Sequence, residues 1–197
     1  VPMILGSDKT RLSKRHGATS VMAYKEMGYL PEALVNYLVR LSWSHGDQEI
    51  FSQKELVDLF SLDAVGKSPA VFNPDKLLWL NAHYIKEASP ARLAEEMKPL
   101  WPAEADVSDE SFIRKIIVDL QPRAKTLVEL AQASEFYFAV QIAYEAEAAQ
   151  KFLTPEVAAH LMSVAAAIPG IEDYSKAGIE AFLKNFIEAN GIKFKAI

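Results

Sequence analysis

A basic segment near the start of the chain carries the residues best suited to chemistry. Arg11, Ser13, Lys14 and Arg15 lie within five residues, and Gly17 follows them closely. Cationic side chains, a hydroxyl group and loop amides together suit a polyphosphate ligand. Taken by itself, however, this composition favours an ordinary solvated basic loop, so a phosphate site needs support from the surrounding sequence.

The elements that must position this segment are helical. Ser20 is placed to cap a short helix that ends before Gly28. Further helix starts are indicated by proline at a first helical position, by a capping residue, or by a Ser/Thr-x-x-Glu capping box. These starts lie at Pro31, Ser52, Asn73, Ser89, Ser108, Thr126, Thr154 and Ser175. The apolar residues that follow each start have helical spacing. The sequence therefore predicts an all-α fold of antiparallel helical bundles in series, with little or no β structure.

Strand signals are confined to two short pieces, residues 3–5 and 193–197. Turn-rich sequence around Ser89-Pro90 and over residues 99–104 favours a boundary near residue 90, and we place a second near residue 150. One continuous helical array without independent domains is an equal alternative.

Composition bounds the class of protein. The 197 residues are 50% hydrophobic and 24% charged, which fits one folded domain or two to three small ones. Cysteine is absent, which excludes disulfides and thiolate metal sites and suits a cytoplasmic location. The sequence contains neither a transmembrane-length apolar run nor a signal peptide pattern. It also lacks an initiator methionine, so we expect a fragment.

The net charge of −5 argues against a nucleic-acid partner, because such proteins are usually basic. The charge is unevenly distributed. Residues 1–16 hold four Lys or Arg against one Asp, whereas residues 131–197 hold five basic residues against eight acidic ones. Any nucleic-acid contact in the later part must depend on local patches.

The order of residues gives the basic segment a second interpretation. The run from Arg11 to Arg15 resembles the Lys-Met-Ser-Lys-Ser signature of class I aminoacyl-tRNA synthetases, and the following residues 16–21 resemble the form found in glutamyl-tRNA synthetases. Further blocks that are similar to this family occur in the same order, at residues 29–38, 43–47, 67–73 and 76–85. On these residues the chain resembles the C-terminal, tRNA-binding portion of a bacterial-type glutamyl-tRNA synthetase.

The resemblance implies roles for the segment. The full enzyme joins glutamate to tRNA(Glu) through glutamyl-adenylate, using ATP with Mg²⁺. Lys14 corresponds to the second lysine of the signature, and its ammonium would stabilise charge on the departing pyrophosphate. Arg11, Ser13 and Arg15 would help bind ATP. Arg11 replaces the first lysine of the signature, which alters the geometry of that contact.

The rest of the catalytic machinery is missing from the sequence. None of His16, His45, His83 and His160 belongs to the His-x-Gly-His type of element that class I enzymes need, and the strand–helix alternation of a nucleotide-binding fold is absent. We therefore expect the chain alone to be catalytically inactive and to bind neither a cofactor nor a metal.

The resemblance implies tRNA(Glu) as the partner, and neither DNA nor a membrane. It divides the chain into a stem-contact domain with the signature loop at 1–90, a helical anticodon-binding subdomain at 91–150, and a second, truncated one at 151–197. Basic and polar residues supply the candidate tRNA contacts: Lys67, Asn73, Lys76 and His83 in the first part, and Arg114, Lys115, Arg123 and Lys125 nearer the anticodon.

Aromatic residues allow two interpretations. Trp43 and Trp79 lie on apolar helix faces and are expected in the core. Phe136, Tyr137 and Phe138 could stack on bases, although packing between helices is the favoured interpretation. Two alternative functions remain open: a helical protein-interaction scaffold, and a fragment of a glutaminyl-tRNA synthetase.

Overall fold

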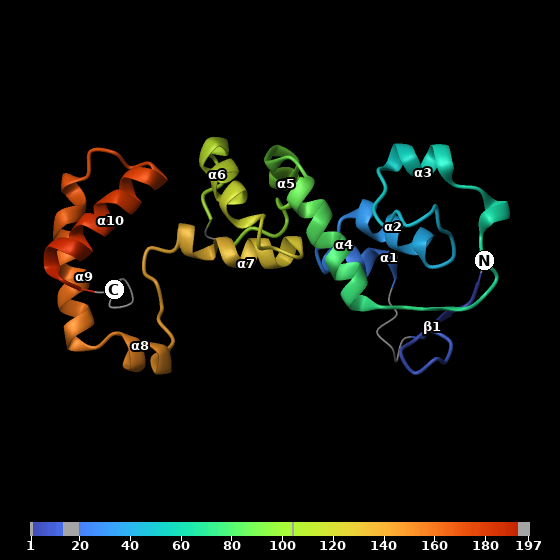
Figure 1. The fold of residues 1–197 in the computed structure, drawn as a ribbon, viewed down its shortest axis with the longest axis horizontal. Coiled ribbons are helices and arrows are strands. Elements are labelled where there is room, and N and C mark those ends of the chain that lie inside the picture. Colours follow the sequence, from blue (N-terminus) through green and yellow to red (C-terminus); the bar gives the residue numbers. More distant parts are fainter. Residues whose placement is uncertain (1, 14–19, 104, 193–197) are drawn as a thin grey trace. The chain divides into compact units, whose positions relative to one another are not determined.

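The computed structural model describes residues 2–13, 20–103 and 105–192 (Figure 1). Contacts between backbone segments divide the chain into two compact units, Val1–Val140 and Gln141–Ile197. Each unit is described separately. Apart from two short strands, the regular elements of the described residues are all helices, which confirms the predicted all-α class.

The first part of unit 1 consists of two short strands and four helices. Strand β1 (Ile4–Leu5) pairs in parallel with β2 (Ala70–Val71), with Ile4 opposite Ala70. The sequence predicted β1 but missed β2, and the other expected strand, residues 193–197, lies outside the described residues. The helices are α1 (Val21–Glu26), α2 (Pro31–Arg40), α3 (Gln53–Leu59) and α4 (Pro74–Glu87), with a short 3₁₀ turn η2 (Leu62–Ala64) after α3.

The starts of these helices follow from local chemistry. Ser52 and Glu55 form the reciprocal capping box that the sequence predicts, with the Ser52 hydroxyl accepting from Glu55 N at 3.2 Å. Pro31 and Pro74 occupy first helical positions, where a missing N–H costs nothing. Helices α2 and α4 then pack against each other through Leu34, Tyr37, Leu77 and Leu80.

Three helices complete unit 1, and Figure 1 shows them beside the end of α4. They are α5 (Pro90–Glu96), α6 (Glu110–Leu120) and α7 (Leu127–Phe138). The N-cap of α6 is Asp109, one residue after the predicted Ser108, because the Asp109 carboxylate accepts from two backbone amides. In α7, Thr126 caps as predicted, but Glu129 accepts from Lys125 N instead of the Thr126 amide. The largest buried cluster joins α2, α4, α5, α6 and α7.

Buried polar side chains tie these helices to α4. Asn81 accepts from Leu30 N at 2.8 Å and donates to Lys125 O at 2.7 Å and Gly28 O at 3.3 Å. Gln121 donates to carbonyls at the end of α4, including Lys86 O at 2.9 Å. Both residues satisfy backbone groups that would otherwise be buried without partners.

Gly28 completes this connection. Its φ of +82° is a conformation that other residues rarely adopt, and a Cβ atom there would lie 2.6 Å from the amide nitrogen of Val128. Its carbonyl also accepts from Leu127 N at 2.9 Å. The backbone before α2 therefore lies directly against the start of α7.

Unit 2 contains α8 (Ala146–Phe152), α9 (Pro155–Ala167), a 3₁₀ turn η3 (Ile168–Gly170) and α10 (Lys176–Asn190). Gly191 ends α10 in the left-handed conformation, which glycine adopts readily. No residue between 141 and 192 is fully buried. Its apolar side chains are at most half-buried, among them Phe182 and Phe186 of α10, whose ring centroids lie 6.3 Å apart.

No single helix in the described parts of the chain has the length and apolar character needed to cross a membrane. One sharply bent pair, residues 146–152 with 155–170, meets those criteria by length and composition only.

Candidate functional site

The basic segment near the start of the chain is anchored to β1. After β1 the chain turns at residues 6–10, where Gly6 N donates to Thr10 O at 2.8 Å and Lys9 adopts a φ of +61°. Leu12 N then donates to Ile4 O at 2.9 Å, and Arg11 forms an isolated antiparallel bridge with Leu5. Arg11 is exposed and Ser13 is half-buried. Lys14 and Arg15, to which the sequence assigns phosphate contacts, lie outside the described residues.

Asp8 organises this turn. Its carboxylate accepts from Thr10 N at 3.0 Å and from the Thr10 hydroxyl at 2.9 Å. Because β1 also pairs with β2, which leads directly into α4, the segment that approaches Lys14 is fixed to the helical part of unit 1.

The helix start at Asn73 is already capped within the chain. The Asn73 side chain accepts from Lys76 N at 3.1 Å, Pro74 has no N–H, and Asp75 places a carboxylate in the first turn. Both the cap and the acidic residue disfavour a bound phosphate at this position. The expected contact of Asn73 with tRNA stays a prediction.

Lys76 is engaged as well. Its Nζ lies 2.5 Å from Glu49 Oε2, and Arg40 contacts the other oxygen of the same carboxylate at 3.2 Å. The hydrogen bond from Lys76 is the main cause that lowers the pKa of Glu49. Burial opposes it, and the hydrogen bond from Arg40 and the charges of both cations add to the lowering. Lys76 Nζ also lies 4.5 Å from the centre of the Trp79 ring.

The other two candidate tRNA contacts from residues 1–90, Lys67 and His83, lie away from the ion pairs of Lys76. Asn73 and Lys76 line a small hollow of 220 Å³, whereas Lys67 lines a different one of 470 Å³ beside Phe60 and Val65. His83 is half-buried, with its ring edge-on to Tyr84 at 5.5 Å. The four residues that the sequence grouped together are thus distributed over separate surfaces.

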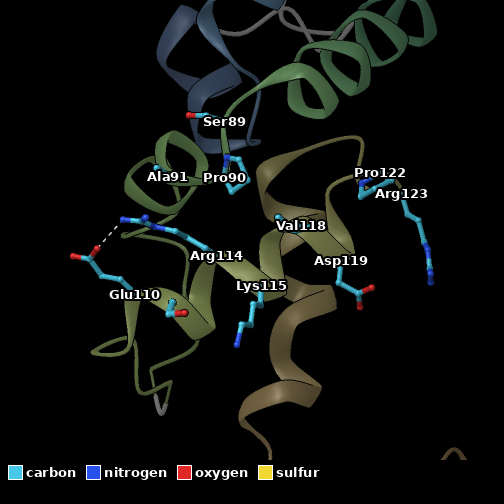
Figure 2. A pocket seen from close by; sticks show the side chains of 11 residues that line it. Ser89, Pro90, Ala91, Glu110, Arg114, Lys115, Val118, Asp119, Pro122 and Arg123 are labelled. Atoms are coloured by element: carbon cyan, nitrogen blue, oxygen red, sulfur yellow. Dashed lines mark hydrogen bonds and ion pairs between the residues drawn. The ribbon is translucent and has the colours of Figure 1, made fainter. Parts of the chain in front are cut away.

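Three basic residues of the second part do converge. Arg114, Lys115 and Arg123 line one open groove of 1040 Å³ between the start of α5 and the outer face of α6 (Figure 2). The groove also contains Ser89, Pro90, Ala91, Glu110, Ser111, Val118, Asp119 and Pro122. Helical spacing places Lys115 and Asp119 on one face of α6, and Pro122 and Arg123 close the groove at the turn that follows.

The cations in the groove differ in their partners. Arg114 forms an exposed ion pair with Glu110 at 2.9 Å, as the dashed line in Figure 2 shows. Within the part of the chain that the structure describes, neither Lys115 nor Arg123 forms a salt bridge. Lys125 lies outside the groove lining, and its backbone N and O are bound by Glu129 and Asn81. Lys115 and Arg123 are therefore the cations best placed for an anionic ligand.

Aromatic residues border this groove. The Tyr137 hydroxyl donates a short hydrogen bond to Asp119, and this bond raises the pKa of Tyr137, together with burial and against the opposing charge of Arg123. The neighbouring Phe136 is 52% exposed. Tyr137 and Phe138 pack against the core as the sequence favoured, whereas Phe136 does not.

The two tryptophans also differ. Trp43 is buried, 3% exposed, as expected. The expectation that Trp79 lies in the core is wrong, because its side chain is 47% exposed and lies beneath Lys76 instead of against a neighbouring helix. Among the described residues, no three His, Asp or Glu side chains come together in a way that could hold a metal ion.

Two family profiles match the chain. Residues 1–79 match the catalytic domain of class I tRNA synthetases of the E and Q type, and residues 92–197 match an anticodon-binding domain. The first match corrects the expectation that the chain is only the C-terminal, tRNA-binding portion of a synthetase, since part of it is catalytic-domain sequence.

Curated relatives and solved structures agree with these profiles. The chain is 62% identical over 198 residues to glutamate–tRNA ligase 1 of Syntrophus aciditrophicus, and 57% identical over 195 residues to the glutamate–tRNA ligase of Geobacter sulfurreducens. A crystal structure of a glutamate–tRNA ligase from Elizabethkingia meningosepticum in complex with its amino acid aligns with 98% of the chain, at 29% identity and a TM-score of 0.84. Each alignment covers 42% of the relative, so the chain spans less than half the length of these proteins.

Proposed function

This chain belongs to the glutamate–tRNA ligase family, and we propose that it acts as the part of such a ligase that carries the signature loop and an RNA-binding helical surface. The reaction of the whole enzyme would join glutamate to tRNA(Glu) with ATP, in the cytoplasm. Its partners would be tRNA(Glu), ATP and glutamate. The named relatives are glutamate–tRNA ligases, which disfavours both a glutaminyl-type enzyme and a protein-interaction scaffold.

In this proposal the basic segment binds ATP. The Lys14 ammonium stabilises negative charge on the departing pyrophosphate, while Arg11, Ser13 and Arg15 hold phosphate oxygens. The anchoring of residues 11–12 to β1 supports this role, because a hydrogen-bonded base restricts where the following residues can reach. Mg²⁺ would arrive with the nucleotide. The chain alone would not form glutamyl-adenylate, since the His-x-Gly-His type of element is absent from its sequence.

The observation that carries the RNA-binding proposal is the convergence of Arg114, Lys115 and Arg123 on one open groove. An RNA backbone presents a row of phosphates. Lys115 and Arg123 form no salt bridge with the residues that the structure describes, so they can contact phosphates without first leaving such a partner. Local concentration of positive charge also explains how a chain of net charge −5 could bind RNA.

The remaining candidates are proposed as weaker contacts. Lys67, His83 and Lys125 are available at separate surfaces, whereas Asn73 and Lys76 would first have to leave their partners. We keep the proposed division into a signature-loop and stem-contact region at 1–90 and anticodon-binding regions at 91–150 and 151–197.

The proposal is tested by binding of labelled tRNA(Glu) to the 197-residue chain as salt is varied, with a non-cognate tRNA as reference. Lys115→Ala and Arg123→Ala should each weaken binding and lower the dependence of log affinity on log salt by about 0.7 to 0.9 per lost phosphate contact. Lys54→Ala is the matched control, since Lys54 is an exposed lysine on α3, away from the groove. Equal affinity in all four proteins would reject the groove as an RNA site.

A further inference from the structure

An aromatic pair, the exposed Phe136 and the half-buried Tyr137, lies at the end of α7. The rings of Phe136 and Tyr137 have centroids 4.1 Å apart and an interplanar angle of 32°, so the two side chains lie against each other in a tilted arrangement. Phe136 is 52% exposed, although the burial of a phenylalanine ring is strongly favourable. The pair therefore presents a supported aromatic surface to solvent.

Tyr137 is held in place from two sides. Its hydroxyl donates to the carboxylate of Asp119, and its ring meets the edge of Phe112 at 6.4 Å in a T-shaped contact. Both partners belong to the outer face of α6, where residues 112, 115 and 119 follow helical spacing. Because Tyr137 is fixed, the ring that packs on it is pre-oriented, which lowers the entropic cost of binding a further ring.

The same contacts place the aromatic pair beside the basic groove. Asp119 both lines the groove and accepts from Tyr137, and the charge of Arg123 acts on the Tyr137 hydroxyl. Lys115 lies one helical turn before Asp119 on α6 and forms no salt bridge with any residue that the structure describes. Asp119 therefore connects the aromatic pair to the groove that holds Lys115 and Arg123.

We propose that Phe136, supported by Tyr137, is a stacking platform for one unpaired base of the bound RNA, whose flanking phosphates lie in the groove at Lys115 and Arg123. The proposal rests on the RNA-binding function proposed above. It states that Phe136 recognises an unstacked nucleotide. A base within a double helix already has both faces covered, whereas a loop base offers a free face. An apolar protein partner would use the aromatic surface without needing the adjacent cations.

The test uses the 197-residue chain and two RNA probes. One is the anticodon hairpin of tRNA(Glu) with 2-aminopurine replacing a loop base in turn, and the other is a fully paired duplex of equal length. Phe136→Leu keeps apolar bulk but removes the ring face. It should reduce hairpin affinity about 5- to 10-fold, abolish quenching of 2-aminopurine at one loop position, and leave the salt dependence unchanged.

Four further measurements make the result specific. Phe136→Trp should restore or exceed the original hairpin affinity, since indole offers a larger stacking face. Trp79→Leu is the matched control, because Trp79 is another exposed aromatic residue with a lysine alongside, and this variant should bind the hairpin normally. Duplex affinity should be unaffected by Phe136→Leu, and the melting temperature should stay constant because Phe136 is half-exposed.

The outcomes distinguish failure of the stacking platform from failure of the proposed RNA-binding function. If Phe136→Leu binds the hairpin as tightly as the original chain while Lys115→Ala and Arg123→Ala weaken it, the platform is refuted and the groove stands. Equal losses on hairpin and duplex would also refute stacking of an unpaired base. If neither cation variant changes RNA affinity, the proposed RNA-binding function itself fails.

Discussion

Replacing Asn81 with leucine should destabilise unit 1 by about 2–4 kcal/mol. Asn81 is completely buried and makes three hydrogen bonds, to Leu30 N, Lys125 O and Gly28 O. Leucine has a similar branched shape but a larger volume, so strain from overpacking adds to the loss. Gly28 O keeps its bond from Leu127 N. The buried Leu30 amide and the partly buried Lys125 carbonyl lose their partner, and an unpaired buried group costs about 1–3 kcal/mol, less where water reaches it.

Urea unfolding followed by tryptophan fluorescence measures this loss directly. The three tryptophans, Trp43, Trp79 and Trp101, all belong to unit 1, so the signal does not report on unit 2. We expect the midpoint of unfolding at a lower urea concentration, with an unchanged slope of the unfolding free energy against urea concentration. Gln132→Leu, at an exposed position on α7 in unit 1, is the control and should shift the midpoint by no more than the equivalent of about 0.5 kcal/mol.

A loss below about 1 kcal/mol for Asn81→Leu would refute this reasoning, since it would mean that water or a backbone shift satisfies both groups. The result matters for function because Asn81 lies between the two segments that match the family profiles. It is one of the residues that hold α4 against the region carrying the groove.

Two further predictions concern contacts between the α2 region and later helices of unit 1. Gly28→Ala should destabilise unit 1 by about 2–4 kcal/mol in the same urea assay, because φ is +82° and the added Cβ would meet Val128 N at 2.6 Å; an unchanged midpoint would contradict it. Burial alone would raise the pKa of Glu32, but the hydrogen bonds and charge of Arg92 outweigh it and lower the pKa. The stabilisation from this pair is therefore present above the ordinary glutamate pKa and is lost as the pH falls through the lowered pKa. The difference in unfolding free energy between the original chain and Arg92→Met should shrink in acid. A difference that is constant with pH would refute the assignment.

Local signals in the sequence predict most of the helices. Ser52, Asn73, Thr154 and Ser175 each accept from a backbone amide at the start of the expected helix, because capping depends only on neighbouring residues. Helix α8 was missed because its N-cap, Glu145, makes no side-chain cap. Strand β2 was missed because two residues become a strand only by pairing with β1, about 65 positions earlier in the chain.

The candidate site was predictable only in its parts. Helical spacing and charge identified Arg114, Lys115 and Arg123, but their convergence with Ser89 and Asp119 depends on how α5, α6 and the following turn pack. The sequence could not show that Lys76 pairs with Glu49, a residue that precedes it by 27 positions. Nor could it separate Phe136, which stays exposed, from its neighbour Phe138, which packs on the core.

Lysine footprinting tests the central claim most directly. The acetylation rate of each lysine in the 197-residue chain is measured by mass spectrometry with and without saturating tRNA(Glu). The proposed groove predicts strong protection of Lys115 and little change at Lys54, which lies on α3 outside the groove. An unchanged rate at Lys115 while tRNA(Glu) is bound would contradict the account, because the RNA would then lie on another surface.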